Sequence, residues 1–292
     1  MAAEAPILVP LDGSELSERA LPYAMRFASA LAAPVVLLAV WRHVDRRRHD
    51  AAPEQDALRR QSAEAAETYL EGVRARYAGE ARVTAIAREG EPAQEILAAC
   101  AELDPRLVAM TTHGRTGLQR WRFGSVAHRV IHEGASPTLV VGPEVLREPA
   151  VEPAVRRVLA PLDGSHFAET ALPLVREVAD AFGAAVLLAR IVPFAVQAYP
   201  FSPVAIGMPT LDEELERGAR AYLESKQSAV PGAEIGVYQG HVAERICDIV
   251  EHQRFDLVVM ATHARAAVGR VLLGSTADRV LQCRAPVLLV RP

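Results

Sequence analysis

Cysteine, aromatic residues and long apolar runs are scarce in this chain of 292 residues. The three cysteines, Cys100, Cys247 and Cys283, lack C-x-x-C spacing, so we expect neither a disulfide framework nor a zinc site and interpret them as small apolar residues. No apolar run approaches the roughly 20 residues of a membrane-spanning helix, and no leader peptide is recognisable, so we expect a cytoplasmic protein without membrane contact. The formal net charge of -4 argues against general nucleic-acid binding.

Two common nucleotide-binding signatures are also missing from the sequence. There is no G-x4-G-K-[ST] string, which a P-loop ATPase would carry, and no G-x-G-x-x-G directly after a first strand, which a dehydrogenase would carry. Both enzyme classes are therefore disfavoured.

An internal repeat dominates the sequence. The segment Val9-Pro10-Leu11-Asp12-Gly13-Ser14 returns as Ala160-Pro161-Leu162-Asp163-Gly164-Ser165 at an offset of 151 residues, and later segments echo at nearly the same spacing. This period matches the usual size of a domain. We therefore predict two copies of one domain, residues 1–145 and 154–292, joined by a linker that contains proline and charged residues.

Each copy alternates short β-branched runs with helical patterns. The runs are apolar almost throughout, which is typical of parallel strands covered on both faces. Alternation with right-handed crossovers predicts an α/β fold with a doubly wound open sheet in each copy. The predicted strands are 7–9, 35–38, 83–86, 107–110 and 138–141, then 158–159, 186–188, 235–237, 257–260 and 287–290; helices are expected near 15–32, 53–78, 91–102 and 124–134 in the first copy.

The loops after the first and fourth strands are the candidate ligand site, because ligands bind beyond the carboxyl ends of such sheets where the strand order reverses. Asp12 can accept hydrogen bonds from ribose hydroxyls or lie near a metal. Gly124 and Ser125 begin a helix whose free N–H groups suit an anion. For Asp12-Gly13-Ser14 the alternative is simply a turn followed by a helix cap.

One spacing points to a known family. The string Thr111-x2-Gly114-x9-Gly124-Ser125 follows a strand that ends in Met110 and is paired with the N-terminal Val-Pro-Leu-Asp-Gly-Ser. Together these closely resemble the universal stress protein family, over essentially the whole chain as a tandem of two domains. The ATP-binding branch of that family carries G-x2-G-x9-G followed by Ser or Thr. The resemblance implies two five-stranded parallel sheets of order 3-2-1-4-5, similar to adenine nucleotide alpha hydrolases.

The same resemblance implies a set of nucleotide contacts with ATP, with or without Mg²⁺. Pro10 and Asp12 would lie near the ribose and base, Val40 would hold adenine, and Met110 would begin the phosphate loop. Arg115 either pairs with phosphate oxygens or is solvated. The remaining implied residues are Thr111, Gly114, Gly124, Ser125 and Val126 in the first copy and Pro161, Asp163, Ile191, Met260, Gly274 and Ser275 in the second.

Departures from the motif separate the copies. Thr111 replaces the first glycine and either crowds the nucleotide or lends it a hydroxyl. In the second copy Ala261 and Ala264 replace both early glycines. If the position of Gly114 needs a positive φ, Ala264 costs about 1 kcal/mol or more. Nucleotide binding is therefore more strongly predicted for the first copy.

Three functions remain open at this point. The leading one is an ATP-binding stress regulator that acts through conformation or an unknown protein partner, with slow or no hydrolysis and no catalytic residue assigned. The second is an interaction module that holds no nucleotide. The third, an adenylating or ATP-hydrolysing enzyme, is disfavoured because the first loop is not rich in glycine and serine. By the resemblance, the final strands, 137–141 and 286–290, would pair within the chain, and a homodimer is a further alternative.

Overall fold

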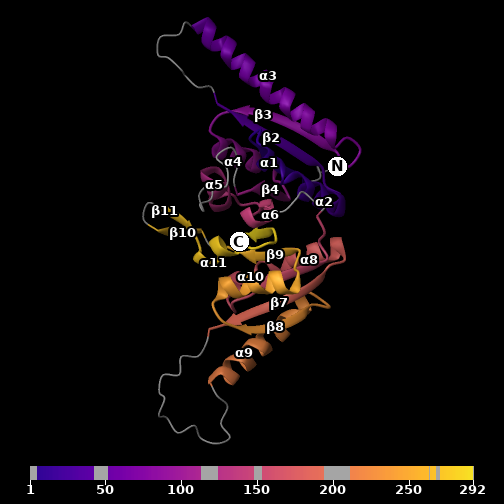
Figure 1. Cartoon of the computed structure of the whole chain (residues 1–292), viewed down its shortest axis with the longest axis vertical. Coiled ribbons are helices and arrows are strands. Elements are labelled where there is room, and N and C mark those ends of the chain that lie inside the picture. Colours follow the sequence, from indigo (N-terminus) through magenta and orange to yellow (C-terminus); the bar gives the residue numbers. More distant parts are fainter. Residues whose placement is uncertain are drawn as a thin grey trace, which may run out of the picture. The chain divides into compact units, whose positions relative to one another are not determined.

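A computed structural model describes residues 5–42, 52–112, 124–147, 153–193, 211–262, 264–267 and 270–291. The chain divides into two compact units, one built essentially from Met1–Pro153 and Ala264–Leu273 and the other from Ala154–His263 and Gly274–Val290 (Figure 1). Of the helices that the structure describes, none is long and apolar enough to cross a lipid bilayer.

The first unit is a five-stranded parallel sheet with helices between the strands. Its strand order is β3-β2-β1-β4-β5, so the order reverses between β1 and β4. The predicted order 3-2-1-4-5 is confirmed. The elements are β1 (Ile7–Leu11), α1 (Glu15–Glu18), α2 (Leu21–Leu31), β2 (Val35–Trp41), α3 (Ala52–Arg76), β3 (Val83–Glu89), α4 (Pro92–Leu103), β4 (Leu107–Thr111), α5 (Ser125–Glu133), β5 (Thr138–Val141) and α6 (Pro143–Arg147).

The helical pattern predicted near 15–32 forms two helices. Ser14 caps α1, because its Oγ accepts a hydrogen bond from the backbone N–H of Ser17 at 3.1 Å. Pro22 then stands in the first turn of α2, where its missing N–H costs no helical hydrogen bond. The short α6 lies within the segment that we interpreted as a linker.

The second unit repeats this architecture. Its strand order is β12-β9-β6-β7-β8, which is the same 3-2-1-4-5 order counted from the other edge. The second copy of the sequence repeat also contains an antiparallel hairpin of β10 and β11, which was not predicted. The elements are β6 (Arg157–Pro161), α7 (His166–Glu169), α8 (Leu172–Phe182), β7 (Ala185–Val192), α9 (Leu211–Lys226), a 3-10 turn (Gln227–Ala229), β8 (Glu234–Gln239), α10 (Val242–Gln253), β9 (Leu257–Ala261), β10 (Ala264–Ala267), β11 (Arg270–Leu273), α11 (Ser275–Val280) and β12 (Val287–Val290).

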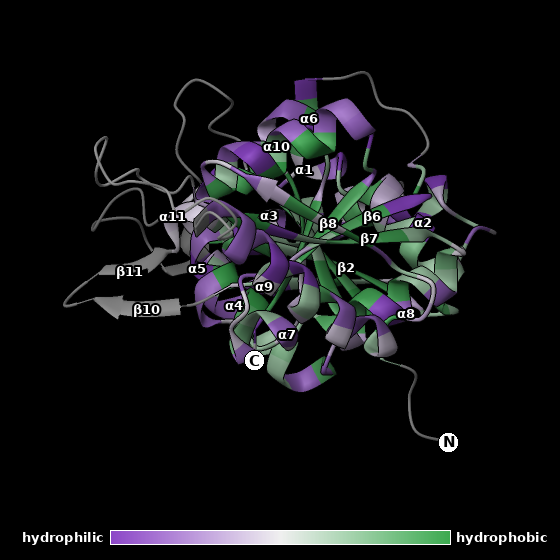
Figure 2. Ribbon diagram, turned by 90° about the horizontal axis from the view of Figure 1, so that it is seen from below, coloured by the Kyte–Doolittle hydropathy of each residue, from purple (hydrophilic) through white to green (hydrophobic). Residues whose placement is uncertain are grey.

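The central strands carry the core of each unit. Figure 2 shows the strands in the colours of apolar residues, whereas the helices mix apolar and polar residues. In the first unit, Leu8, Val36 and Leu38 from the sheet pack against Ile96 of α4 and Val130 of α5. This burial of apolar surface is the main force that holds the helices on the sheet.

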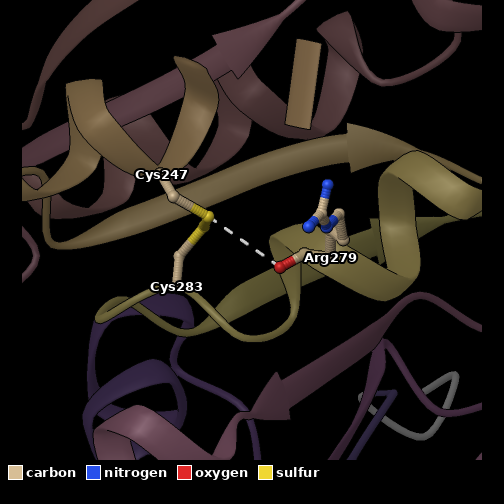
Figure 3. The surroundings of a disulfide bond; sticks show 3 residues. All are labelled: Cys247, Arg279 and Cys283. Carbon is tan, nitrogen blue, oxygen red and sulfur yellow. Dashed lines mark hydrogen bonds between the residues drawn. A yellow bond between two sulfur atoms is a disulfide. The ribbon is translucent and has the colours of Figure 1, made fainter. Parts of the chain in front are cut away.

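The structure corrects our interpretation of two cysteines. Cys247 on α10 and Cys283, which follows α11, form a disulfide with their Cα atoms 5.1 Å apart (Figure 3). Their separation of 36 residues gives no local signal, and only the packing of α10 against α11 brings them together. The exclusion of a disulfide was therefore wrong for this pair. Cys100 keeps the predicted role, since it is a free thiol buried among apolar side chains.

Candidate functional site

The turn after β1 holds an ordered carboxylate at the carboxyl edge of the first sheet. Asp12 Oδ1 accepts hydrogen bonds from the backbone N–H of Ser14 at 3.0 Å and from Ser14 Oγ at 2.6 Å. Gly13, with φ of 82°, takes the left-handed conformation that this turn requires. The Asp-Gly-Ser string thus makes a turn and a helix cap, and in doing so it fixes the orientation of the half-buried Asp12 carboxylate.

The second unit has the same turn after β6. Asp163 Oδ1 accepts from the backbone N–H of Ser165 at 2.9 Å and from Ser165 Oγ at 2.5 Å, and Ser165 Oγ accepts from the backbone N–H of Ala168 at 3.1 Å. Gly164 has φ of 85°. Here the carboxylate is exposed, whereas that of Asp12 is half-buried.

The predicted residues within the strands of the first unit lie at equivalent positions. Pro10, Val40 and Met110 are each the penultimate residue of a strand, in β1, β2 and β4 respectively. Met110 is 5% exposed and packs in the apolar core, and Val40 packs partly against the same core. The side chain of Met110 therefore belongs to the core, and this residue can reach a ligand at the edge only through its backbone. Thr111, the last residue of β4, is also buried.

Gly124 brings the start of α5 to the end of β4. Its backbone N–H donates to the carbonyl oxygen of Thr112 at 2.9 Å, and a Cβ built on it would lie 3.2 Å from that oxygen. A side chain here would push the two backbones apart. Ser125, the first residue of α5, is exposed, and Val126 packs partly against the core. The first N–H groups of α5 lack partners within the helix, so this end can bind an anion. Gly114 and Arg115 lie outside the described residues.

A cluster of one carboxylate and two guanidinium groups flanks this edge and was missed by sequence reasoning. Glu91 caps α4 by accepting from the backbone N–H of Gln94 at 3.0 Å, and it pairs with Arg42 at 2.9 Å and Arg129 at 2.8 Å. Burial works to raise the pKa of Glu91, but the backbone hydrogen bonds and both arginine charges outweigh it and lower that pKa. Proline at residue 92 signalled the cap; the arginine partners come from the residue after β2 and from α5, and they gave no local signal.

The strands of the second unit place the equivalent predicted residues at their ends, but the loop after its fourth strand differs. Pro161 ends β6, Ile191 is the penultimate residue of β7, and Met260 is the penultimate residue of β9. A Cβ on Gly274 would meet no atom within 4 Å, unlike one on Gly124. Ser275 begins a helix of only six residues.

The two alanines that replace the early glycines of the motif in the second copy both lie in β-strands. Ala261 is the last residue of β9, and Ala264 begins the hairpin strand β10. Thr262, between them, is 5% exposed, and its Oγ1 has no hydrogen-bond partner among the residues that the structure describes. The segment that we expected as a phosphate loop is therefore partly a β-hairpin in the second copy of the repeat.

Comparison with known proteins decides the family. A profile of the universal stress protein family matches residues 5–142 and again residues 154–291. The chain belongs to the universal stress protein family. The predicted resemblance, as a tandem of two such domains, is confirmed.

Relatives match this universal stress protein one half at a time. A universal stress protein of Thermus aquaticus is 33% identical over 142 residues, covering 47% of this chain and 98% of that protein. One from Methanocaldococcus jannaschii is 32% identical over 147 residues, covering 47% of this chain and 82% of that protein. A crystal structure of a universal stress protein from Archaeoglobus fulgidus covers 100% of this chain and 99% of its own, with a TM-score of 0.72 and 21% identity. At that identity the structural match supports the fold alone.

Proposed function

We propose that this universal stress protein binds ATP at the carboxyl edge of its first unit and acts as a stress-response regulator through nucleotide-dependent conformation or partner binding. One observation carries the proposal. The hydrogen bond from Gly124 to Thr112 places the N-terminus of α5 beside the end of β4, where the strand order reverses. Open α/β sheets bind ligands at this point, and helix N-termini there bind phosphate.

The residues at this edge suit the parts of ATP. The free N–H groups at the start of α5 would receive phosphate oxygens, and the Asp12 carboxylate would accept hydrogen bonds from ribose hydroxyls. The ends of β1 and β2 would supply apolar contacts to the base. Among the described residues no group of three carboxylate, histidine or cysteine side chains could hold a metal ion, so Mg²⁺ would be bound chiefly through the phosphates.

The proposal assigns no catalytic residue, and hydrolysis would be slow or absent. The protein would then respond to whether nucleotide is bound rather than to turnover, and a protein partner of unknown identity would read the bound state. The competing hypotheses are an interaction module that holds no nucleotide and an ATP-consuming enzyme.

An ATP titration with matched glycine variants tests the proposal. Calorimetry with and without Mg²⁺ would compare wild type, Gly124→Ala and the control Gly274→Ala. We expect Gly124→Ala to weaken binding by about tenfold, because its Cβ crowds the Thr112 carbonyl and shifts the start of α5. Gly274→Ala has open space and should bind like wild type.

The alternatives give different results in the same assay. A wild type that releases no nucleotide on denaturation and binds no ATP would refute the proposal and favour the interaction module. ATP turnover well above a slow background would favour the enzyme.

A further inference from the structure

One carboxylate of the first unit joins two parts of the candidate nucleotide site. Glu91 Oε1 accepts a hydrogen bond from Arg42, the residue after β2, at 2.9 Å. Its other oxygen, Oε2, accepts from Arg129 of α5 at 2.8 Å and from the backbone N–H of Gln94 at 3.0 Å. The carboxylate thus connects the end of β2, the start of α4 and α5.

The groups around this carboxylate are held in turn by neighbours. The backbone N–H of Gly90 donates to the carbonyl oxygen of Trp41 at 3.0 Å, so the residue before Glu91 is bound to the last residue of β2. Arg129 Nε donates to Glu133 Oε1 at 3.0 Å, which orients its guanidinium group on α5. A rotation of α5 about its axis would therefore break the contact between Arg129 and Glu91.

Partial burial strengthens this connection. The side chains of Glu91 and Arg129 are 34% and 36% exposed, so solvent and salt screen their attraction less than that of a fully exposed pair. A single surface ion pair contributes little to stability. Glu91, however, accepts from two guanidinium groups and one helix N–H, and charge-assisted hydrogen bonds of this kind are the stronger ones.

The second unit has the backbone part of this arrangement without the carboxylate. The backbone N–H of Gly240 donates to the carbonyl oxygen of Val192, the last residue of β7, at 3.0 Å. The next residue is His241, whose side chain makes no cap hydrogen bond at the start of α10. The residue after β7 is Pro193, which carries no charge.

The arginine of the second unit pairs with a different carboxylate. Arg279 lies five residues after Gly274, as Arg129 lies five residues after Gly124, so the two arginines correspond. Arg279 Nη1 lies 2.8 Å from Glu244 Oε1, and this pair joins α11 to α10. Glu244 therefore provides a control: it binds the corresponding arginine and links one helix to another.

We propose that Glu91 is a positioning residue for ATP, which holds the end of β2 and the start of α5 at the separation that one nucleotide spans. This inference rests on the proposed function, in which the end of β2 contacts the base and α5 receives the phosphates. A ligand that uses both parts gains affinity from their alignment. Glu91 acts through its arginine partners and not as a ligand, because a carboxylate repels phosphate.

Ligands that occupy one part of the site or both parts test this role. Calorimetry would measure ATP, and ligand-observed NMR would measure adenosine and tripolyphosphate, with wild type, Glu91→Gln and the control Glu244→Gln. Glutamine keeps an acceptor for the start of α4 but loses the charge that holds both arginines. We expect Glu91→Gln to weaken ATP binding by about fivefold and to leave the two fragments within about twofold of wild type, because only ATP depends on the alignment. Glu244→Gln should bind all three ligands like wild type.

Two results of these titrations would overturn the inference. One is equal affinity of wild type and Glu91→Gln for ATP. The other is a loss of adenosine or tripolyphosphate affinity that matches the loss for ATP, since Glu91 would then support one part of the site by itself.

Native-state amide exchange of the nucleotide-free protein gives a readout that a loss of stability alone does not produce. In Glu91→Gln the amides of α5 should exchange faster by a larger factor than those of α2, because α5 loses its connection to Glu91. An equal factor for both helices would indicate a general loss of stability and would overturn the positioning role. This comparison decides the matter if a fragment binds too weakly to be measured.

The proposed function and this inference fail in different ways. A wild type that binds no ATP refutes the proposed function. The exchange comparison needs no ligand, so a larger effect on α5 than on α2 would still support the connection through Glu91, and an equal effect would overturn that connection too.

Discussion

Reduction of the disulfide between Cys247 and Cys283 should destabilise the second unit selectively. The bond ties α10 to the segment after α11, and these two helices pack against each other. The first unit has Leu97 at the position that corresponds to Cys247. Leu97 Cδ2 lies 3.6 Å from the position that a Cβ on Gly134, just after α5, would take, so an apolar side chain stands where the second unit has its covalent bond.

The size of the effect follows from the length of chain that the bond closes. A separation of 36 residues corresponds to a loop-closure contribution of about 3.5–4 kcal/mol to the free energy of unfolding. Because 1.4 kcal/mol corresponds to a factor of ten, this free energy changes the equilibrium constant for opening of the second unit by roughly several hundred-fold. Reduction is a cleaner perturbation than substitution, because Cys283 is buried and its replacement would also alter packing.

Native-state amide exchange with and without a phosphine reductant measures the effect unit by unit. Peptides from α10 and α11 should exchange several hundred times faster after reduction, by the estimate above. Peptides from α4 and α5 should change little. Fluorescence gives a second probe, because the two tryptophans, Trp41 and Trp121, both lie in the first copy of the sequence repeat.

One control variant and one refuting outcome complete the test. The double variant Cys247→Ala, Cys283→Ala should not respond to reductant. Equal exchange of α10 with and without reductant in wild type, with the thiols shown to be reduced, would refute the loop-closure reasoning.

Two further predictions concern titratable groups of the first unit. Burial raises the pKa of the Cys100 thiol to about 11, and a hydrogen bond with Ser136 opposes this only weakly. Iodoacetamide at pH 8 should therefore label Cys100 about a hundredfold more slowly in the native protein than in urea, and equal rates would contradict its burial. Glu91→Gln should destabilise the first unit at pH 7, and the difference from wild type should shrink as the pH falls below 4.5, because the pKa of Glu91 is lowered by folding and its contribution is lost on protonation. Urea melts from pH 7 to pH 3 measure this, and a difference independent of pH would contradict it.

Local sequence patterns were sufficient for the architecture. Apolar runs such as Val35 to Leu38 form strands because both faces of a parallel sheet are buried, and their alternation with helices leaves few topologies to choose from. The repeat then required the same fold twice. The turn at Asp12 was equally predictable from the sequence, because its hydrogen bonds join residues that are close in the chain.

The extra break between α1 and α2 and the hairpin of β10 and β11 were not predicted. A proline at residue 22 fits either the first turn of a new helix or a kink in one long helix. Packing against the sheet decides between the two. The hairpin replaces a segment that the family pattern suggested to be a loop. Neither feature has a strong local signal.

The sequence by itself therefore determined two α/β units and the turns that hold Asp12 and Asp163, and its resemblance to a known family implied the strand order of each unit. Only the tertiary structure decided that Gly124 meets Thr112, that Cys247 meets Cys283, and that Glu91 joins Arg42 to Arg129. The physical reason is the range of the interactions. Strands, turns and caps are set by neighbours in the chain, whereas these contacts join residues that become neighbours only when separate elements pack on one sheet.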